Sequence, residues 1–201
     1  MGPQGIVRPR AHDVLVVVDM QNWFMGAGGG HILAPVLALV RRWSQAGGRV
    51  LFTRYVNAPG SPHERLLGWR EMRGSPDVDI VPALLPYTRS ADVLDKHVYT
   101  LFTGEGQELA ARRGWTDLYF CGVDTECCVA QSAVGAFEHG LTPWVITDAC
   151  TSHVGPDAHD AGMLVLRRTI GRRQLITVDG LGLGTLPEMC EPDVRTTREN
   201  R

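Results

Sequence analysis

Short apolar runs alternate along the chain with stretches in which apolar residues recur every three or four positions. Residues 14–18 form a continuous apolar run, which is typical of a strand that is covered on both faces. Further short segments with the composition of strands lie at residues 49–53, 91–96, 117–121, 143–147 and 174–177. The pattern therefore predicts a sheet of about six strands.

The stretches between these strands have the spacing of helices. Apolar residues at positions 32, 33, 36, 37, 40 and 43 predict a helix over residues 31–46, and Gly47 follows it. The segments 106–113, 125–139 and 157–169 predict three more helices. Regular alternation of strands and helices favours a parallel sheet with helices on its faces. We therefore predict an α/β fold, a Rossmann-like three-layer sandwich with a mostly parallel sheet.

Length and composition favour one domain. The chain has 201 residues, of which 44% are hydrophobic, enough for one sizeable core. We expect a single domain over residues 1–201 with its core at about 13–177, and a mobile, charged tail at 187–201. Residues 56–82 are rich in Gly, Pro and Ser and lack a period, which predicts a long, functional loop over one end of the sheet.

The charge and cysteine content exclude several classes of partner. A formal net charge of -2 gives no electrostatic reason to expect a nucleic acid. No run approaches 18 apolar residues, and residues 1–13 lack the apolar core of a signal peptide, so we expect no membrane partner. Five cysteines without a C-x-x-C pair argue against a disulfide framework and favour a cytoplasmic location.

Three chemically reactive groups follow predicted strands. Asp19 follows the run at 14–18, Lys96 ends the segment 91–96, and the turn at 122–125 leads from another strand to Cys128. Ligands of open parallel sheets bind beyond the carboxyl ends of the strands, so these groups should share one edge of the sheet.

Cys128 is the candidate nucleophile. If Thr125 caps the following helix, Cys128 occupies its third position, where unpaired N–H groups and the helix dipole favour a thiolate. Lys96 would favour the thiolate further, and Asp19 could take the thiol proton and return it to a leaving amine. The competing interpretation is a buried cysteine that acts only as a small hydrophobic residue, but the strand-end Asp19 and Lys96 argue against it.

These residues lie in segments that resemble the isochorismatase-like cysteine hydrolase superfamily. The matching segments are VVVDMQNWF at 16–24, DVLDKHVYTLFTG at 92–104 and GVDTECCVAQSAVGAFEHGLTPWVITDACTS at 122–152. The similarity extends from about residue 13 to residue 177. The superfamily includes nicotinamidases, N-carbamoylsarcosine amidase and ureidoacrylate or biuret amidohydrolases.

The resemblance implies a catalytic triad of Asp19, Lys96 and Cys128. It also implies a cis peptide between Val123 and Asp124, in a turn that shapes an oxyanion hole with the N–H groups of Asp124 and Cys128 as donors. The adjacent Cys127 could in principle attack instead, but the family pattern places the nucleophile directly before Val129. We expect a structural role for Cys127, with a redox role as the alternative.

The resemblance also bears on metal binding. Nicotinamidase-like relatives carry an Asp-x-His pair after the second strand, where this chain reads Thr53-Arg54-Tyr55-Val56-Asn57. The histidines at positions 31, 63, 97, 139, 153 and 159 are scattered without the spacing of ligands. We therefore predict no metal and no other cofactor.

The remaining candidates concern the substrate. Gln21 is two residues beyond Asp19 and could orient it or contact the substrate. Aromatic residues that could line a pocket are Trp23, Phe24, Tyr99 and Phe102. Arg54 is a candidate anchor for a substrate carboxylate, because a guanidinium matches the geometry of that group; an exposed loop arginine is the alternative.

The sequence therefore predicts a metal-independent cysteine amidohydrolase that cleaves a C–N bond of a small amide or N-carbamoyl compound through a thioester. In this scheme Asp19 also serves as the base for the water that hydrolyses the thioester. One alternative is hydrolysis of a vinyl ether of the isochorismate type, which the superfamily performs without the cysteine. The other is a ligand-binding or redox-sensing protein that uses Cys127 and Cys128. By resemblance we expect a homodimer or homotetramer.

Overall fold

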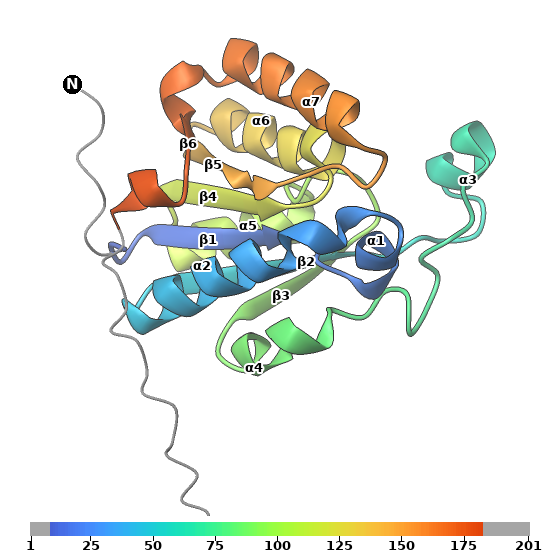
Figure 1. Cartoon of the computed structure of the whole chain (residues 1–201), viewed down its shortest axis with the longest axis horizontal. Coiled ribbons are helices and arrows are strands. Elements are labelled where there is room, and N and C mark those ends of the chain that lie inside the picture. The colour runs from blue at the N-terminus through green and yellow to red at the C-terminus, as the bar shows by residue number, and fades with distance from the viewer. Residues whose placement is uncertain (1–8, 183–201) are drawn as a thin grey trace, which may run out of the picture.

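The computed structural model of the chain describes residues 9–182 and shows three layers (Figure 1). The predicted tail at 187–201 lies outside the described residues. Six parallel strands form one sheet in the order β3-β2-β1-β4-β5-β6. Their bounds are β1 Asp13–Val18, β2 Arg49–Tyr55, β3 Asp92–Lys96, β4 Asp117–Gly122, β5 Thr142–Cys150 and β6 Leu175–Ile176. The predicted α/β sandwich is confirmed, and the described strands all pair in parallel.

The central strand β1 explains why the sheet is covered on both faces. Every residue of β1 is buried, and alternate side chains enter two different apolar cores. Leu15 and Val17 pack with residues of α2 (Leu33–Gln45) on one face. Val14, Val16 and Val18 pack on the other face with residues of α5 (Gly104–Arg113), α6 (Ala130–Glu138) and α7 (Pro156–Thr169). The continuous apolar run is thus a consequence of burial on both sides.

The predicted helix at 125–139 is divided into two parts. Residues Thr125–Val129 form a π-helical turn, and the α-helix α6 begins only at Ala130. In a π-helical turn each hydrogen bond spans one residue more than in an α-helix. Such turns are rare, and they are frequently found at functional sites. Strand β5 also continues three residues beyond the predicted end at 147, with a shift in its register against β4 between Phe120 and Gly122.

The long segment at 56–82 is not a structureless loop. It contains the short helix α3 (Pro62–Leu67), which projects from the body of the molecule (Figure 1). The Ser61 hydroxyl caps α3 by accepting a hydrogen bond from the Glu64 N–H. Asn57 holds the base of the segment, because its side-chain amide donates to the carbonyls of Trp69 and Glu71. Short helices α1 (Asn22–Gly26) and α4 (Leu85–Thr88) lie before and after this region in the sequence.

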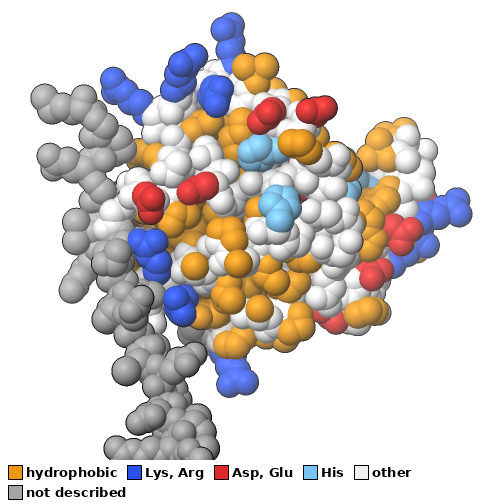
Figure 2. Space-filling view, viewed as in Figure 1, with side chains coloured by type: hydrophobic (Ala, Val, Ile, Leu, Met, Phe, Trp, Pro, Cys, Tyr) orange, Lys and Arg blue, Asp and Glu red, His pale blue; other side chains and the backbone are white. Residues whose placement is uncertain are grey.

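The described residues also bear on membrane insertion and on the distribution of surface charge. None of their helices combines the length and apolar character that crossing a bilayer requires. On the face shown in Figure 2, basic side chains lie mainly at the periphery, and no continuous basic surface covers the centre.

Gly162 in α7 allows this helix to pack directly against the π-helical turn. A Cβ atom at position 162 would lie 2.7 Å from the Glu126 nitrogen and 2.8 Å from its Cα, and both atoms are backbone. We predict that Gly162→Ala lowers the free energy of unfolding by about 1–3 kcal/mol, because the turn must shift to admit the methyl group. Urea denaturation measures the change.

Gly104→Ala is the matched control, since a Cβ at this helical position meets no atom within 4 Å. It should leave the free energy of unfolding unchanged or raise it slightly, because alanine favours the helix. Equal stability of the two variants would contradict the close packing of α7 on the turn.

Candidate active site

Asp19, Lys96 and Cys128 meet in the interior at the carboxyl edge of the sheet. The Lys96 Nζ atom lies 2.7 Å from Asp19 Oδ2 and 3.2 Å from Cys128 Sγ. All three residues are at least 95% buried, with exposed fractions of 0%, 1% and 5%. One ammonium thus bridges a carboxylate and a thiol away from bulk water.

The strand order explains how these groups reach one another. Lys96 ends β3 and Asp19 follows β1, and β2 lies between them. The long lysine side chain therefore crosses β2, where its Nζ lies 5.5 Å from the centre of the Tyr55 ring. The Thr53 hydroxyl of β2 donates a hydrogen bond of 2.6 Å to Asp19 Oδ1. Asp19 itself has a φ of 48°, a left-handed conformation that aspartate adopts more readily than most residues.

The turn before Cys128 places main-chain groups beside the thiol. The Val123–Asp124 peptide is cis, as the resemblance implies. Val123 is fully buried, and within residues 9–182 no atom accepts a hydrogen bond from the Asp124 N–H. That N–H is available to a substrate oxygen.

The predicted cap of the nucleophile helix is wrong. Asp124 occupies the cap position, and its carboxylate binds His153 instead of the helix. Thr125 is buried, and its hydroxyl lies 2.8 Å from His159 Nδ1. The π-helical turn shifts the start of the helix. The side chains of Asp124 and Thr125 therefore bond to two histidines distant in sequence, one after β5 and one in α7.

Burial determines the resting protonation of the nucleophile. Desolvation raises the pKa of Cys128 well above its ordinary value, and although Lys96 lowers it, Asp19 raises it further. Burial alone would lower the pKa of Lys96, but Asp19 and Cys128 together raise it above its ordinary value. Burial thus favours the thiol form of Cys128 beside a cationic lysine, against the thiolate that the helix start was expected to favour. A nucleophilic role would therefore require a base.

A cavity of about 210 Å³ opens beside the thiol. Its walls are largely aromatic, and Cys128, Cys127 and Asp124 provide sulfur and oxygen atoms. The lining comprises Phe24, Tyr55, His63, Leu67, Trp69, Tyr99, Asp124, Cys127, Cys128 and His153. In this lining of described residues there is neither a lysine nor an arginine.

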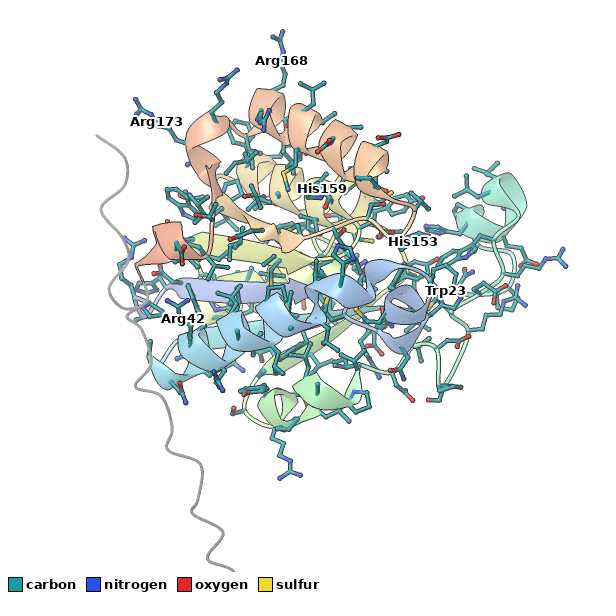
Figure 3. All side chains as sticks on the ribbon, in the orientation of Figure 1. Trp23, Arg42, His153, His159, Arg168 and Arg173 are labelled. Carbon is teal, nitrogen blue, oxygen red and sulfur yellow. The ribbon has the colours of Figure 1, made fainter. Side chains whose placement is uncertain are left out.

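The structure brings some of the predicted substrate residues to this cavity and not others. Phe24 and Tyr99 line it. Trp23 lies behind the wall, where its ring contacts Phe24 and His153 at centroid distances of 5.2 Å; Figure 3 shows Trp23 and His153 on neighbouring elements. Gln21, Arg54 and Phe102 do not line the cavity.

Each of these three residues has a different partner. The buried Gln21 amide donates to the carbonyls of Tyr55 and Val78 and accepts from the Tyr55 N–H, so it joins β1 to β2 and the long loop. Arg54 makes two hydrogen bonds of 2.6 Å to Asp95 on the neighbouring strand. Phe102 stacks on His139, in a separate hollow between α5 and α6.

Several lining residues escape sequence reasoning. Tyr55 is the last residue of β2, and its position two residues after Thr53 on the same strand could have indicated it. His63 and Trp69 belong to the long loop, whose path no periodicity describes. His153 follows β5, and its place in the cavity wall depends on the unexpected extension of that strand.

Comparison with known proteins places this geometry in context. The isochorismatase domain family matches residues 13–175, most of the chain and all six strands except the last residue of β6. The chain belongs to the isochorismatase family. Its members share the hydrolase character that the triad indicates.

Individual relatives agree with this assignment. The chain is 30% identical over 190 residues to ureidoacrylate amidohydrolase RutB from Agrobacterium fabrum, a match that covers 77% of this chain and 82% of the relative. It is 33% identical to isochorismatase domain-containing protein 2 from Bos taurus, but over only 69 residues, 34% of this chain and 30% of that protein.

A solved structure confirms the fold. The pyrazinamidase of Pyrococcus horikoshii in complex with zinc superposes with a TM-score of 0.69 at 24% identity, over 83% of this chain and 98% of that one. The zinc in that protein raises the question of a metal here. Among residues 9–182 no three His, Cys, Asp or Glu side chains are grouped as metal ligands. Near the cavity His63 is surrounded by the rings of Tyr55, Trp69 and Tyr99, which do not form a metal site, so the residues present do not fit a zinc ion.

Gln21 provides a test of its role as a connector. We predict that Gln21→Leu lowers the free energy of unfolding by about 2–4 kcal/mol, because it leaves buried main-chain groups of Tyr55 and Val78 without partners. Urea denaturation followed by tryptophan fluorescence measures the change.

Asn22→Ala is the control, since Asn22 donates one exposed hydrogen bond to Pro76 of the same loop. The Asn22→Ala substitution should lower the free energy of unfolding by less than about 1 kcal/mol. If Gln21→Leu unfolded at the same urea concentration as Asn22→Ala, the connecting role of Gln21 would be wrong and its predicted contact with the substrate would regain support.

Proposed function

We propose that the protein is a cysteine amidohydrolase that cleaves a C–N bond of a small amide or N-carbamoyl compound through a thioester, without a metal ion. The observation that carries the proposal is the bridge from Asp19 through Lys96 to Cys128 beside a cavity. The family assignment supports a hydrolase, and RutB is a relative whose name describes an amidohydrolase.

The first half of the reaction uses the buried triad. The Cys128 thiol gives its proton to the Asp19 carboxylate, to which Lys96 links it, as Sγ attacks the carbonyl carbon of the amide. The Asp124 N–H can hold the oxygen of the tetrahedral intermediate. When the intermediate collapses, the C–N bond breaks and the proton passes from Asp19 to the leaving nitrogen.

Lys96 stabilises the charges that move during this step. Its ammonium contacts both Asp19 and Cys128, so it offsets the negative charge whether that charge lies on oxygen or on sulfur. The raised pKa of Lys96 keeps it protonated throughout. Asp19, Lys96 and Cys128 are buried, and burial strengthens the electrostatic interactions among them relative to those in water.

The cavity favours a small substrate with a flat or apolar acyl group. Aromatic rings from Phe24, Tyr55, Trp69 and Tyr99 form its walls. Since its lining contains neither lysine nor arginine among the described residues, a substrate carboxylate could find positive charge there only on a histidine. Arg54, the anchor predicted for such a group, bonds to Asp95 instead.

The two alternatives make different demands on the cysteines. Hydrolysis of a vinyl ether would not need Cys128, which here is held by Lys96 at 3.2 Å and is therefore part of the charge arrangement. A redox role would need Cys127 to ionise, but burial raises the pKa of Cys127 to about 11. Assembly into a homodimer or homotetramer and a cytoplasmic location stay predictions.

We predict that Cys128→Ala lowers amide turnover on the order of 10³-fold or more, as expected for loss of a nucleophile. The measurement is release of ammonia or amine from a panel of small aromatic and aliphatic carboxamides and N-carbamoyl compounds. Intact-mass spectrometry of quenched reactions should show one acyl group on the unmodified protein and none on the variant.

Cys121→Ala is the matched control, because Cys121 is equally buried but lies in the opposite core, away from the cavity. It should retain turnover per folded molecule. Undiminished turnover in Cys128→Ala together with inactive Asp19→Ala would instead support ether-type hydrolysis. An acyl group found on Cys127 would transfer the nucleophilic role to that residue.

A further inference from the structure

A second pair of ionisable residues lies in the wall of the same cavity. Asp124 and His153 both line it, although they are 29 residues apart in the sequence. The His153 Nδ1 atom lies 2.7 Å from Asp124 Oδ2, and the His153 main-chain N–H donates to Asp124 Oδ1 at 2.9 Å. The triad makes no use of this pair.

These contacts determine the orientation of the imidazole ring. Both oxygens of Asp124 act as acceptors, so Nδ1 carries a proton and the neutral ring has its lone pair on Nε2. The rings of Trp23 and Phe24 contact the imidazole at centroid distances of 5.2 and 5.6 Å and restrict its rotation. Nε2 has no hydrogen-bond partner within residues 9–182. An oriented imidazole with a free nitrogen, in the wall of the same cavity as the Cys128 thiol, has the features of a general base.

We propose that His153 is a second catalytic residue, whose Nε2 atom activates the water that hydrolyses the Cys128 thioester, with Asp124 as its positioning residue. The proposal rests on the proposed function, since it requires a thioester at Cys128. It differs from the expectation that Asp19 activates this water.

The accessibility of the two candidate bases supports this division. Asp19 is fully buried and does not line the cavity. Its Oδ1 accepts a hydrogen bond from Thr53 and its Oδ2 accepts one from Lys96, both on the protein side of the cavity wall. His153 lines the cavity, and its side chain is 23% exposed. Water that enters the cavity meets His153 without displacing a member of the triad.

The hydrolytic step balances with these groups alone. The water oxygen bonds to the thioester carbon as one water proton passes to Nε2. The tetrahedral intermediate then collapses and the C–S bond breaks, with its electron pair returning to Sγ. The proton on Nε2 is returned to the thiolate, which restores Cys128 as a thiol and leaves the carboxylic acid product.

The protonation of His153 is compatible with this role. The hydrogen bond that His153 donates to Asp124 raises the pKa of His153 above its ordinary value, burial opposes the shift, and the charges of Asp124 and Glu126 add to it. Other ionisable groups line the same cavity or the adjoining hollow. They are Tyr55, His63, Tyr99, Cys127 and Cys128 in the cavity, and His31 and His159 in the hollow. A base acts in its neutral form, so the hydrolysis rate should rise with pH through the raised pKa of His153.

We test the proposal with 4-nitrophenyl acetate, which acetylates an active thiol and releases 4-nitrophenolate. In His153→Gln we expect the initial burst of nitrophenolate to persist and the steady-state rate to fall about 100-fold, the loss typical of a general base. Intact mass and peptide mapping should show acetyl-Cys128 accumulating. His12→Gln is the matched control, since His12 is exposed and bonds to the Gly114 carbonyl, outside the cavity; it should behave as the unmodified protein.

Asp124→Asn provides a second variant that keeps the main-chain N–H at this position. The His153 N–H still needs an oxygen acceptor, so the asparagine NH₂ faces Nδ1 and the neutral ring must carry its proton on Nε2. Nε2 then cannot accept a proton from water. Hydrolysis of acetyl-Cys128 should fall at every pH and lose its rise through the pKa of His153, while acetylation persists.

The outcomes separate the two levels of the proposal. If the unmodified protein forms and hydrolyses acetyl-Cys128, and both variants hydrolyse it at the unmodified rate, the role of His153 is wrong and the proposed function stands. If neither the unmodified protein nor the variants form acetyl-Cys128, the proposed function fails and the inference fails with it. Thermal melting checks that both variants are folded.

Discussion

A buried lysine ammonium is the constraint on which this site depends. A charge that is fully removed from water is costly unless it is paired and hydrogen-bonded. Lys96 meets that requirement through Asp19, Cys128 and the Val98 carbonyl, at 2.7, 3.2 and 3.3 Å. Each of these contacts depends on a different part of the fold. The order of the strands, the left-handed backbone at Asp19 and the turn before Cys128 must all be correct for the ammonium to be satisfied.

The same constraint couples the chemistry to the loop that forms the cavity. Strand β2 passes beneath the Lys96 side chain and supplies Thr53 to Asp19 and Tyr55 to the cavity wall. Gln21 then ties the main chain of Tyr55 to Val78 at the far end of the long loop. A shift in the loop would therefore alter the cavity wall and the support of the acid together. The buried Gln21 thus binds main chain, and aromatic residues line the cavity.

The nucleophile turn combines a family feature with features of this chain. The Val123–Asp124 peptide is cis, which the resemblance in sequence had implied. The carboxylate of Asp124 and its hydrogen bonds to His153 add an ionisable pair to the cavity wall. After β2 the chain has no Asp-x-His pair, and His63 is surrounded by aromatic rings. The cavity wall therefore combines a buried thiol with a histidine.

Sequence by itself determined the order of strands and helices and placed Asp19, Lys96 and Cys128 at one edge of the sheet. A strand that is buried on both faces has a continuous apolar sequence. Asp19 and Lys96 lie at the carboxyl ends of two parallel strands, which the sequence locates. Sequence could not place the cavity, because Tyr55, His63, Trp69 and His153 come from segments without periodicity or from the unforeseen extension of β5. It also suggested a thiolate at Cys128 from the helix dipole, whereas the depth of burial, a property of the whole fold, raises the pKa of that thiol. The contacts of Arg54 and Thr125 were likewise decided by neighbours distant in sequence, since a side chain binds whichever partner the packed strands and helices bring within reach.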